Sequence, residues 1–166
     1  MNLSFEQYLK AFGLGIVLAV LGIGGYVWYQ QANAVPEPDT LPTVTVYKSP
    51  TCGCCSEWIE HLQANGFTVE ARDTSNVTPI KQRLNVPRTL SSCHTAVVGD
   101  YVVEGHVPAD EVKRLLVNKP KFAGISVPGM PIGSPGMERG NQVDRYNVIA
   151  FDENGNSSVV ARYGEE

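Results

Sequence analysis

Three of the four cysteines in the chain, Cys52, Cys54 and Cys55, lie within four positions of one another. Cys54 and Cys55 are adjacent, and adjacent cysteines seldom form a disulfide because the ring that would close is strained. Four cysteines in 166 residues are also too few for a disulfide-dense secreted scaffold. The spacing therefore predicts a redox centre, a metal centre, or both.

The elements expected around this loop favour reactive thiolates. A short strand is predicted at 43–48, which is rich in β-branched and aromatic residues. A helix is predicted at 55–64, where apolar side chains recur at i, i+3, i+4 and i+7 from Cys55. The positive end of this helix would point at the cysteine loop and lower the thiol pKa values. Low-pKa thiols serve both disulfide exchange and metal ligation, so the loop alone leaves both chemistries open.

The rest of the chain predicts an α/β domain. Strands are expected at 67–73 and on either side of Gly99-Asp100 within 95–107, and helices at 79–84 and after Pro108. Residues 121–141, with three prolines and five glycines, are expected to form a loop. A β-hairpin is expected at 145–163, with its turn at Asn154-Gly155.

A Cys-x-x-Cys between the first strand and the first helix, followed by this order of elements, resembles the thioredoxin fold over about 43–118. The resemblance implies that Cys52 and Cys55 are the redox pair. Thioredoxin-like folds place a cis-proline before the third strand, and here Cys93-His94-Thr95 falls at that position, with His94 in place of the proline. Pro87 is a nearby alternative for the same role. In the first alignment, Cys93 and His94 would add two metal ligands to the thiol pair.

The donor types favour copper over zinc. Adjacent Cys54 and Cys55 fit a single tetrahedral zinc ion poorly, whereas crowded thiolates suit soft Cu(I), since one sulfur can bridge two ions. Met130 and Met137 add two thioethers in the glycine- and proline-rich loop, where they are either ligands or packing residues. His106, in "EGHVP", is either a ligand or a surface residue.

The N-terminal part of the chain predicts export. Residues 11–29 contain nineteen positions without a charge, close to the roughly 20 that a transmembrane helix needs. Ala32-Asn33-Ala34 resembles a signal-peptidase site, but the apolar run is longer than that of a typical signal peptide, which favours an uncleaved anchor. We therefore expect an anchor or signal segment at 1–29 and a linker at 30–42. One domain at 43–166 would follow, with a C-terminal extension at 119–166.

The net charge of −4 and the lack of a basic stripe argue against a nucleic-acid partner. His61 lies off the apolar face of the first predicted helix and is expected to be solvated.

Four stretches together resemble a known family: "SPTCGCCSEWIEHL", "VPRTLSSCHTAVV", "YVVEGHVPADEVKRLL" and "GMPIGSPGME". The family is a small group of exported bacterial thioredoxin-like proteins, long described as a domain of unknown function, that includes the copper-resistance protein CopG. The resemblance implies copper binding in the periplasm. It leaves open whether the protein is an enzyme.

The first hypothesis is a periplasmic Cu(I)-binding protein of copper resistance, anchored in the inner membrane or released by signal cleavage, with a site that can be multinuclear. Its expected partners are copper ions, the membrane and periplasmic copper-handling proteins. Its predicted ligands are Cys52, Cys54, Cys55, Cys93, His94, His106, Met130 and Met137. The alternative is a thiol-disulfide oxidoreductase with Cys52 as nucleophile and Cys55 as resolving thiol. A zinc-stabilised interaction module is the third reading.

Overall fold

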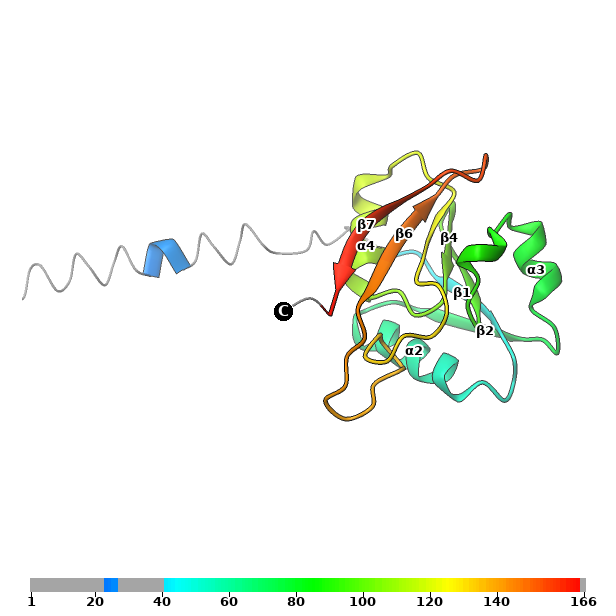
Figure 1. The fold of residues 1–166 in the computed structure, drawn as a ribbon, viewed down its shortest axis with the longest axis horizontal. Helices are drawn as coiled ribbons and strands as arrows, with labels where there is room; N and C mark the ends of the chain where they lie inside the picture. Colours follow the sequence, from blue (N-terminus) through cyan, green and yellow to red (C-terminus); the bar gives the residue numbers. More distant parts are fainter. Residues whose placement is uncertain (1–22, 27–40, 165–166) are drawn as a thin grey trace, which may run out of the picture. The chain divides into compact units, whose positions relative to one another are not determined.

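The computed structural model describes residues 23–26 and 41–164 (Figure 1). The chain divides into two compact units, Met1–Val35 and Pro36–Glu166, and of the first unit only the helical residues 23–26 are described. Most of the predicted apolar segment, the signal-peptidase site and nearly all of the linker lie outside the described residues. Among the helices that are described, none combines the length and the hydropathy needed to cross a bilayer.

The second unit is a mixed α/β domain built on one seven-stranded sheet, in the order β2-β1-β3-β4-β5-β6-β7. The pairs β1/β2 and β4/β5 are parallel and the other four are antiparallel. The strands are β1 Val44–Lys48, β2 Val69–Asp73, β3 Thr95–Val98, β4 Tyr101–Glu104, β5 Gly124–Ser126, β6 Tyr146–Phe151 and β7 Ser157–Tyr163. The helices are α2 Gly53–Ala64, α3 Thr78–Arg83, the 3-10 turn η1 Arg88–Leu90 and α4 Ala109–Asn118.

Strand alternation sorts the helices onto the two faces of the sheet. On β4, Val103 belongs to the main core, which also contains Trp58 of α2 and Val112 of α4. Its neighbour Val102 belongs to a smaller cluster with Leu90 of η1. The helices α2 and α4 therefore cover one face of the sheet, and the segment around η1 packs on the other.

The hairpin predicted at 145–163 forms as β6 and β7. Its turn is fixed by Asp152, whose Oδ1 accepts hydrogen bonds from the backbone N–H groups of Asn154 and Asn156, both at 2.9 Å. Side chains of this kind stabilise turns by satisfying backbone donors locally.

Two expectations are corrected. The segment 121–141 is not all loop, because Gly124–Ser126 forms β5, paired with both β4 and β6. A strand of three residues is too short to show an alternating pattern. Helix α2 begins at Gly53, two residues before the expected start, with Cys52 as its N-cap. Cys54 and Cys55 therefore lie in its first turn.

Candidate metal centre

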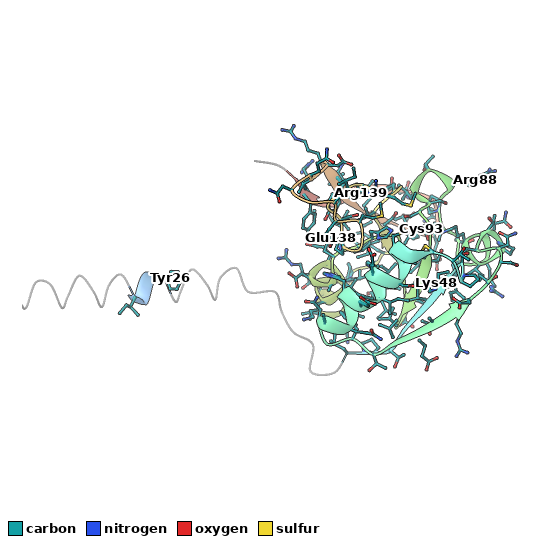
Figure 2. The ribbon with its side chains drawn as sticks, turned by 90° about the horizontal axis from the view of Figure 1, so that it is seen from below. Tyr26, Lys48, Arg88, Cys93, Glu138 and Arg139 are labelled. Carbon is teal, nitrogen blue, oxygen red and sulfur yellow. A yellow bond between two sulfur atoms is a disulfide. The ribbon has the colours of Figure 1, made fainter. Side chains whose placement is uncertain are left out.

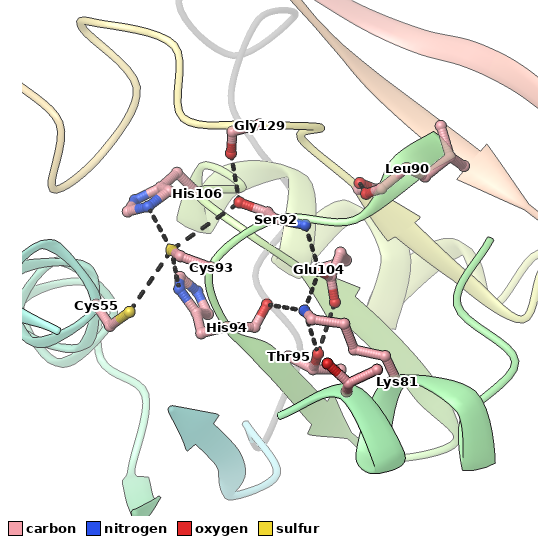
Figure 3. Close-up of polar contacts among 12 residues, drawn as sticks. Cys55, Lys81, Leu90, Ser92, Cys93, His94, Thr95, Glu104, His106 and Gly129 are labelled. Atoms are coloured by element: carbon pink, nitrogen blue, oxygen red, sulfur yellow. Dashed lines mark hydrogen bonds and ion pairs between the residues drawn. The ribbon is translucent and has the colours of Figure 1, made fainter. Parts of the chain in front are cut away.

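The four cysteines meet where the first turn of α2 faces the segment before β3. Cys52 and Cys55 form a disulfide, and Cys54 is a free thiol with its Sγ 3.6 Å from that of Cys52. The Sγ of Cys93 lies 3.5 Å from that of Cys55 (Figure 3). All four sulfur atoms lie within 4.8 Å of one another. Residues 38 positions apart in the chain thus form one thiol cluster.

Two imidazoles border the same cluster from the other side of Cys93. The Sγ of Cys93 lies 3.3 Å from Nδ1 of His94 and 3.1 Å from Nε2 of His106 (Figure 3). The Nδ1 of His106 donates a hydrogen bond to the backbone oxygen of Pro135 at 2.8 Å. This bond fixes the tautomer that leaves Nε2 with a free lone pair facing Cys93, as metal-binding histidines require. The reading of His106 as a surface residue is wrong, because its side chain is fully buried.

His94 is fully buried and held between two other rings. Its ring centroid lies 4.4 Å from that of Trp58 and 5.1 Å from that of His106. Trp58 is itself fixed, because its Nε1 donates to the backbone oxygen of Val107 at 2.9 Å. The Nε2 of His94 has no hydrogen-bond partner in the described part of the chain. All described peptide bonds, including Cys93–His94, are trans.

Burial governs the protonation of the centre. It raises the pKa of Cys93 to about 12, and the nearby Cys54 adds to the effect. Burial also lowers the pKa of His94 well below 6.5, and that of His106 in the same direction. Glu138, which Figure 2 shows on the same side of the domain as Cys93, opposes the shift at His106. Without metal, the centre therefore holds neutral imidazoles and a protonated Cys93, and metal binding would release that proton.

A buried ion pair holds the backbone that carries Cys93 and His94. The Oε1 of the fully buried Glu104 accepts hydrogen bonds from the backbone N–H of Ser92 at 2.6 Å and from Lys81. The Oε2 accepts the hydroxyl proton of Thr95 at 2.7 Å. Lys81 also donates to the Thr95 hydroxyl at 2.9 Å and to the backbone oxygen of His94 at 3.4 Å (Figure 3). Sequence reasoning missed this network, although a carboxylate after three apolar or aromatic strand residues is a signal for it.

The loop after β5 packs closely against the first turns of α2. A Cβ placed on Gly136, whose φ is +80°, would lie 2.7 Å from the backbone oxygen of Cys54 and 2.7 Å from the backbone nitrogen of Trp58. Only glycine allows this approach. Met137 follows and is half-buried, whereas Met130 is 54% exposed. The ligand role of both thioethers stays a prediction.

Comparison with known proteins identifies the family. A family model described as "Protein of unknown function, DUF411" matches residues 90–137. Two solved structures titled "Copper resistance protein copG", forms 2 and 1, are 43% and 42% identical, with TM-scores of 0.70 and 0.71. The matches cover 75% and 76% of this chain and 99% and 100% of those chains. The chain belongs to this DUF411 family. No curated protein matches it.

One histidine of this DUF411 chain takes no part in the cluster. His61 is half-buried rather than solvated, and its Nε2 accepts the backbone N–H of Ala109 at 3.1 Å. It satisfies a donor at the start of α4, which has no side-chain cap of its own. Burial lowers the pKa of His61, consistent with a neutral acceptor. The role of His61 is structural: it joins α2 to α4.

Proposed function

We propose that this protein is a periplasmic copper-binding protein of copper resistance and homeostasis that binds Cu(I) through clustered thiolates. The observation that carries the proposal is the convergence of four cysteine sulfurs within 4.8 Å. Soft thiolates suit Cu(I), as they also suit zinc and iron–sulfur clusters. The 42–43% identity to two copper-resistance proteins supports the same assignment.

The proposed site is multinuclear and forms when the disulfide between Cys52 and Cys55 is reduced. Each thiolate can then bridge two Cu(I) ions, which lowers the repulsion between neighbouring sulfur charges. The first turn of α2 places its free N–H groups and positive dipole end at Cys54 and Cys55, where they would stabilise the negative charge of metal-bound sulfurs. His94 and His106 would complete the coordination at the edge next to Cys93.

We infer a thioredoxin-like fold for the part of the domain from β1 to α4. The inference is supported by the sheet order β2-β1-β3-β4, with β2 parallel to β1 and with β3 and β4 antiparallel in turn. It is also supported by the disulfide at the N-terminus of α2, the helix that follows β1. The strands β5, β6 and β7 would then be an extension of this core.

We also propose that the domain is exported. The apolar run at 11–29 favours an inner-membrane anchor, with a cleaved signal peptide as the alternative. Its partners would then be the inner membrane and periplasmic copper-handling proteins that deliver or accept the metal.

The second candidate function is thiol-disulfide exchange, and the disulfide between Cys52 and Cys55 favours it. Reduced Cys52 would attack a substrate disulfide and form a mixed disulfide, releasing one substrate thiol. Cys55 would then attack the sulfur of Cys52 and release the second substrate thiol. The substrate gains two electrons and the enzyme ends with its disulfide closed.

Cys54 separates the two functions, because a bridged Cu(I) cluster needs it and a disulfide enzyme does not. We expect the reduced full chain, loaded with Cu(I) without oxygen, to bind several ions. The Cys54→Ser variant should bind fewer, since one bridging sulfur is lost. Copper per chain is measured against a competing Cu(I) chelator, with circular dichroism as the check that the fold is retained.

An oxidoreductase would give the opposite pattern. The wild-type chain would bind little copper, and Cys54→Ser would keep the wild-type rate of disulfide exchange. A single Cu(I) ion, held equally tightly by the wild type and by Cys54→Ser, would contradict the cluster.

A further inference from the structure

Cys93 belongs to two donor groups at once. One group contains the four cysteine sulfurs, and the other joins the Sγ of Cys93 to one nitrogen each of His94 and His106, within 4.8 Å of one another. The disulfide joins the sulfurs of Cys52 and Cys55, so neither is available as a thiolate ligand, and the all-thiolate group is incomplete. The disulfide leaves the group of Cys93, His94 and His106 complete.

The second group is held in place by contacts outside the thiol loop. His106 is oriented by its hydrogen bond to Pro135, at 2.8 Å, and His94 by the ring of Trp58. Both histidine side chains are fully buried. The segment carrying Cys93 is held by the 2.6 Å hydrogen bond from the Ser92 backbone N–H to Glu104. Ligands that are fixed by such outer contacts bind metal without a large ordering cost.

We propose that Cys93, His94 and His106 form a separate site for one divalent copper ion, which operates while the disulfide between Cys52 and Cys55 is closed. One thiolate and two imidazoles are the donor set of blue-copper sites, which can hold Cu(II), whereas the all-thiolate group suits Cu(I). Among divalent first-row ions, Cu²⁺ binds such donors most tightly. Binding releases the proton of Cys93 and transfers no electron.

The inference rests on the proposed copper function and extends it. Reduced and oxidised forms of the chain would bind different oxidation states of copper, through groups that share one sulfur. The state of the disulfide would therefore select the copper species that the protein binds.

The test uses the full, untagged chain with its disulfide closed, which thiol counting verifies as two free thiols per chain. The chain is titrated with Cu(II) without oxygen, and thiolate-to-copper charge-transfer absorption and electron paramagnetic resonance are recorded. Copper X-ray absorption counts the ligands. We expect one ion per chain, with one sulfur and two imidazole nitrogens. Co(II), which thiols do not reduce, should bind with the same stoichiometry and serves as a second probe.

Variants assign the ligands. Cys93→Ser should abolish the charge-transfer band, and His106→Gln should weaken Cu(II) binding by at least about tenfold, the loss typical of a damaged metal site. His61→Gln is the matched control, since it removes the third histidine, which lies outside both donor groups. This control should retain the band and the wild-type affinity.

The inference is overturned if the oxidised wild type gives no charge-transfer band, or if its copper has only oxygen and nitrogen ligands. It is equally overturned if His106→Gln keeps the band and the wild-type affinity. A parallel titration of the reduced chain with Cu(I) separates this failure from failure of the proposed function. Several Cu(I) ions on the reduced chain, with no Cu(II) site on the oxidised chain, would refute only the present inference.

Discussion

At the level of single residues, the position of Cys93 depends on Glu104, a carboxylate outside the donor groups. A buried carboxylate is costly to desolvate unless it is paired and fully hydrogen-bonded. Glu104 meets this condition through Lys81, Thr95 and the backbone of Ser92. These hydrogen bonds offset the cost of burying the Glu104 carboxylate, and they hold the segment that carries Cys93 and His94 in place.

We expect Glu104→Gln to lower the free energy of unfolding by about 3 kcal/mol, because Lys81 loses its counter-charge while its side chain is only 13% exposed. Urea denaturation of the metal-free chain measures the change. The control is Glu70→Gln, which breaks the exposed pair of Glu70 with Arg72, whose side chains are 54% and 62% exposed. That change should cost less than about 1 kcal/mol. Equal costs for the two variants would show that the buried pair is not a support.

At the level of elements, helix α2 joins the candidate metal centre to the rest of the domain. Its first turn carries the cysteines, and Trp58 in its middle packs against His94. His61, near its end, accepts a hydrogen bond from the first residue of α4. The backbone of the same helix also contacts Gly136 of the loop that orients His106. Displacement of the loop at Gly136 should therefore reach the centre through the first turns of α2.

The contact between Gly136 and α2 can be tested with an added methyl group. Gly136→Ala should displace the loop, because its Cβ would clash with backbone atoms of Cys54 and Trp58. We expect a loss of about 1–3 kcal/mol in unfolding free energy, as for other overpacked sites, together with weaker Cu(I) binding. Gly140→Ala is the control, since Gly140 also has a positive φ but open space around its Cβ position. Copper affinities that fall equally in both variants would contradict this role of the loop.

The link between α2 and α4 predicts a pH dependence of stability. Burial lowers the pKa of His61 below its ordinary value of 6.5, against the opposite effect of Glu138 and Asp110. As the pH falls below about 6.5, the unfolded chain takes up a proton at His61 before the folded chain does. The contribution of His61 to the free energy of unfolding is therefore fully present above about pH 6.5. It is lost as the pH falls toward the lower pKa of His61 in the folded chain.

We expect the wild type to lose more free energy of unfolding than His61→Gln between about pH 7 and pH 5.5. Glutamine keeps an acceptor but does not titrate, and the other histidines contribute equally to both proteins. Urea denaturation series at the two pH values measure the difference. Parallel pH profiles would mean that protonation of His61 is not coupled to folding.

At the level of the whole molecule, the C-terminal extension contributes contacts to the candidate metal centre. The strands β5 to β7 extend the sheet from β4, and the loop between β5 and β6 carries Pro135 and Gly136. Pro135 fixes the ring of His106, while Gly136 allows the loop to lie against α2. The extension is therefore part of the site that the first four strands begin.

The location of the protein is tested on the full chain in its cell. Because residues 11–29 carry no charge over nineteen positions, we expect the protein to fractionate with membranes and to resist carbonate extraction. A protease added to the medium around spheroplasts should cleave the domain. A soluble mature form that begins at Val35 would instead show that the segment is a cleaved signal.

The sequence by itself determined the elements whose signals are local. β-Branched and aromatic residues placed β1, the 3.6-residue period placed α2, and Asn154-Gly155 placed the last hairpin, because each pattern depends on neighbouring residues only. The spacing of Cys52, Cys54 and Cys55 likewise indicated soft-metal or redox chemistry before any contact was known. Cys93 and His94 entered through a family resemblance rather than through a local pattern.

The tertiary structure decided which distant groups meet. Strand β5 is stabilised by pairing with β4 and β6, and its three residues carry no pattern of their own. His106 turns out to be buried beside Cys93 rather than exposed, because Pro135 holds its ring from a segment 29 residues away. The hydrogen bonds of Glu104 to the segment before β3, and that of His61 to the start of α4, also join residues that are distant in the sequence. Such contacts are set by packing between elements, and no short stretch of sequence contains both partners.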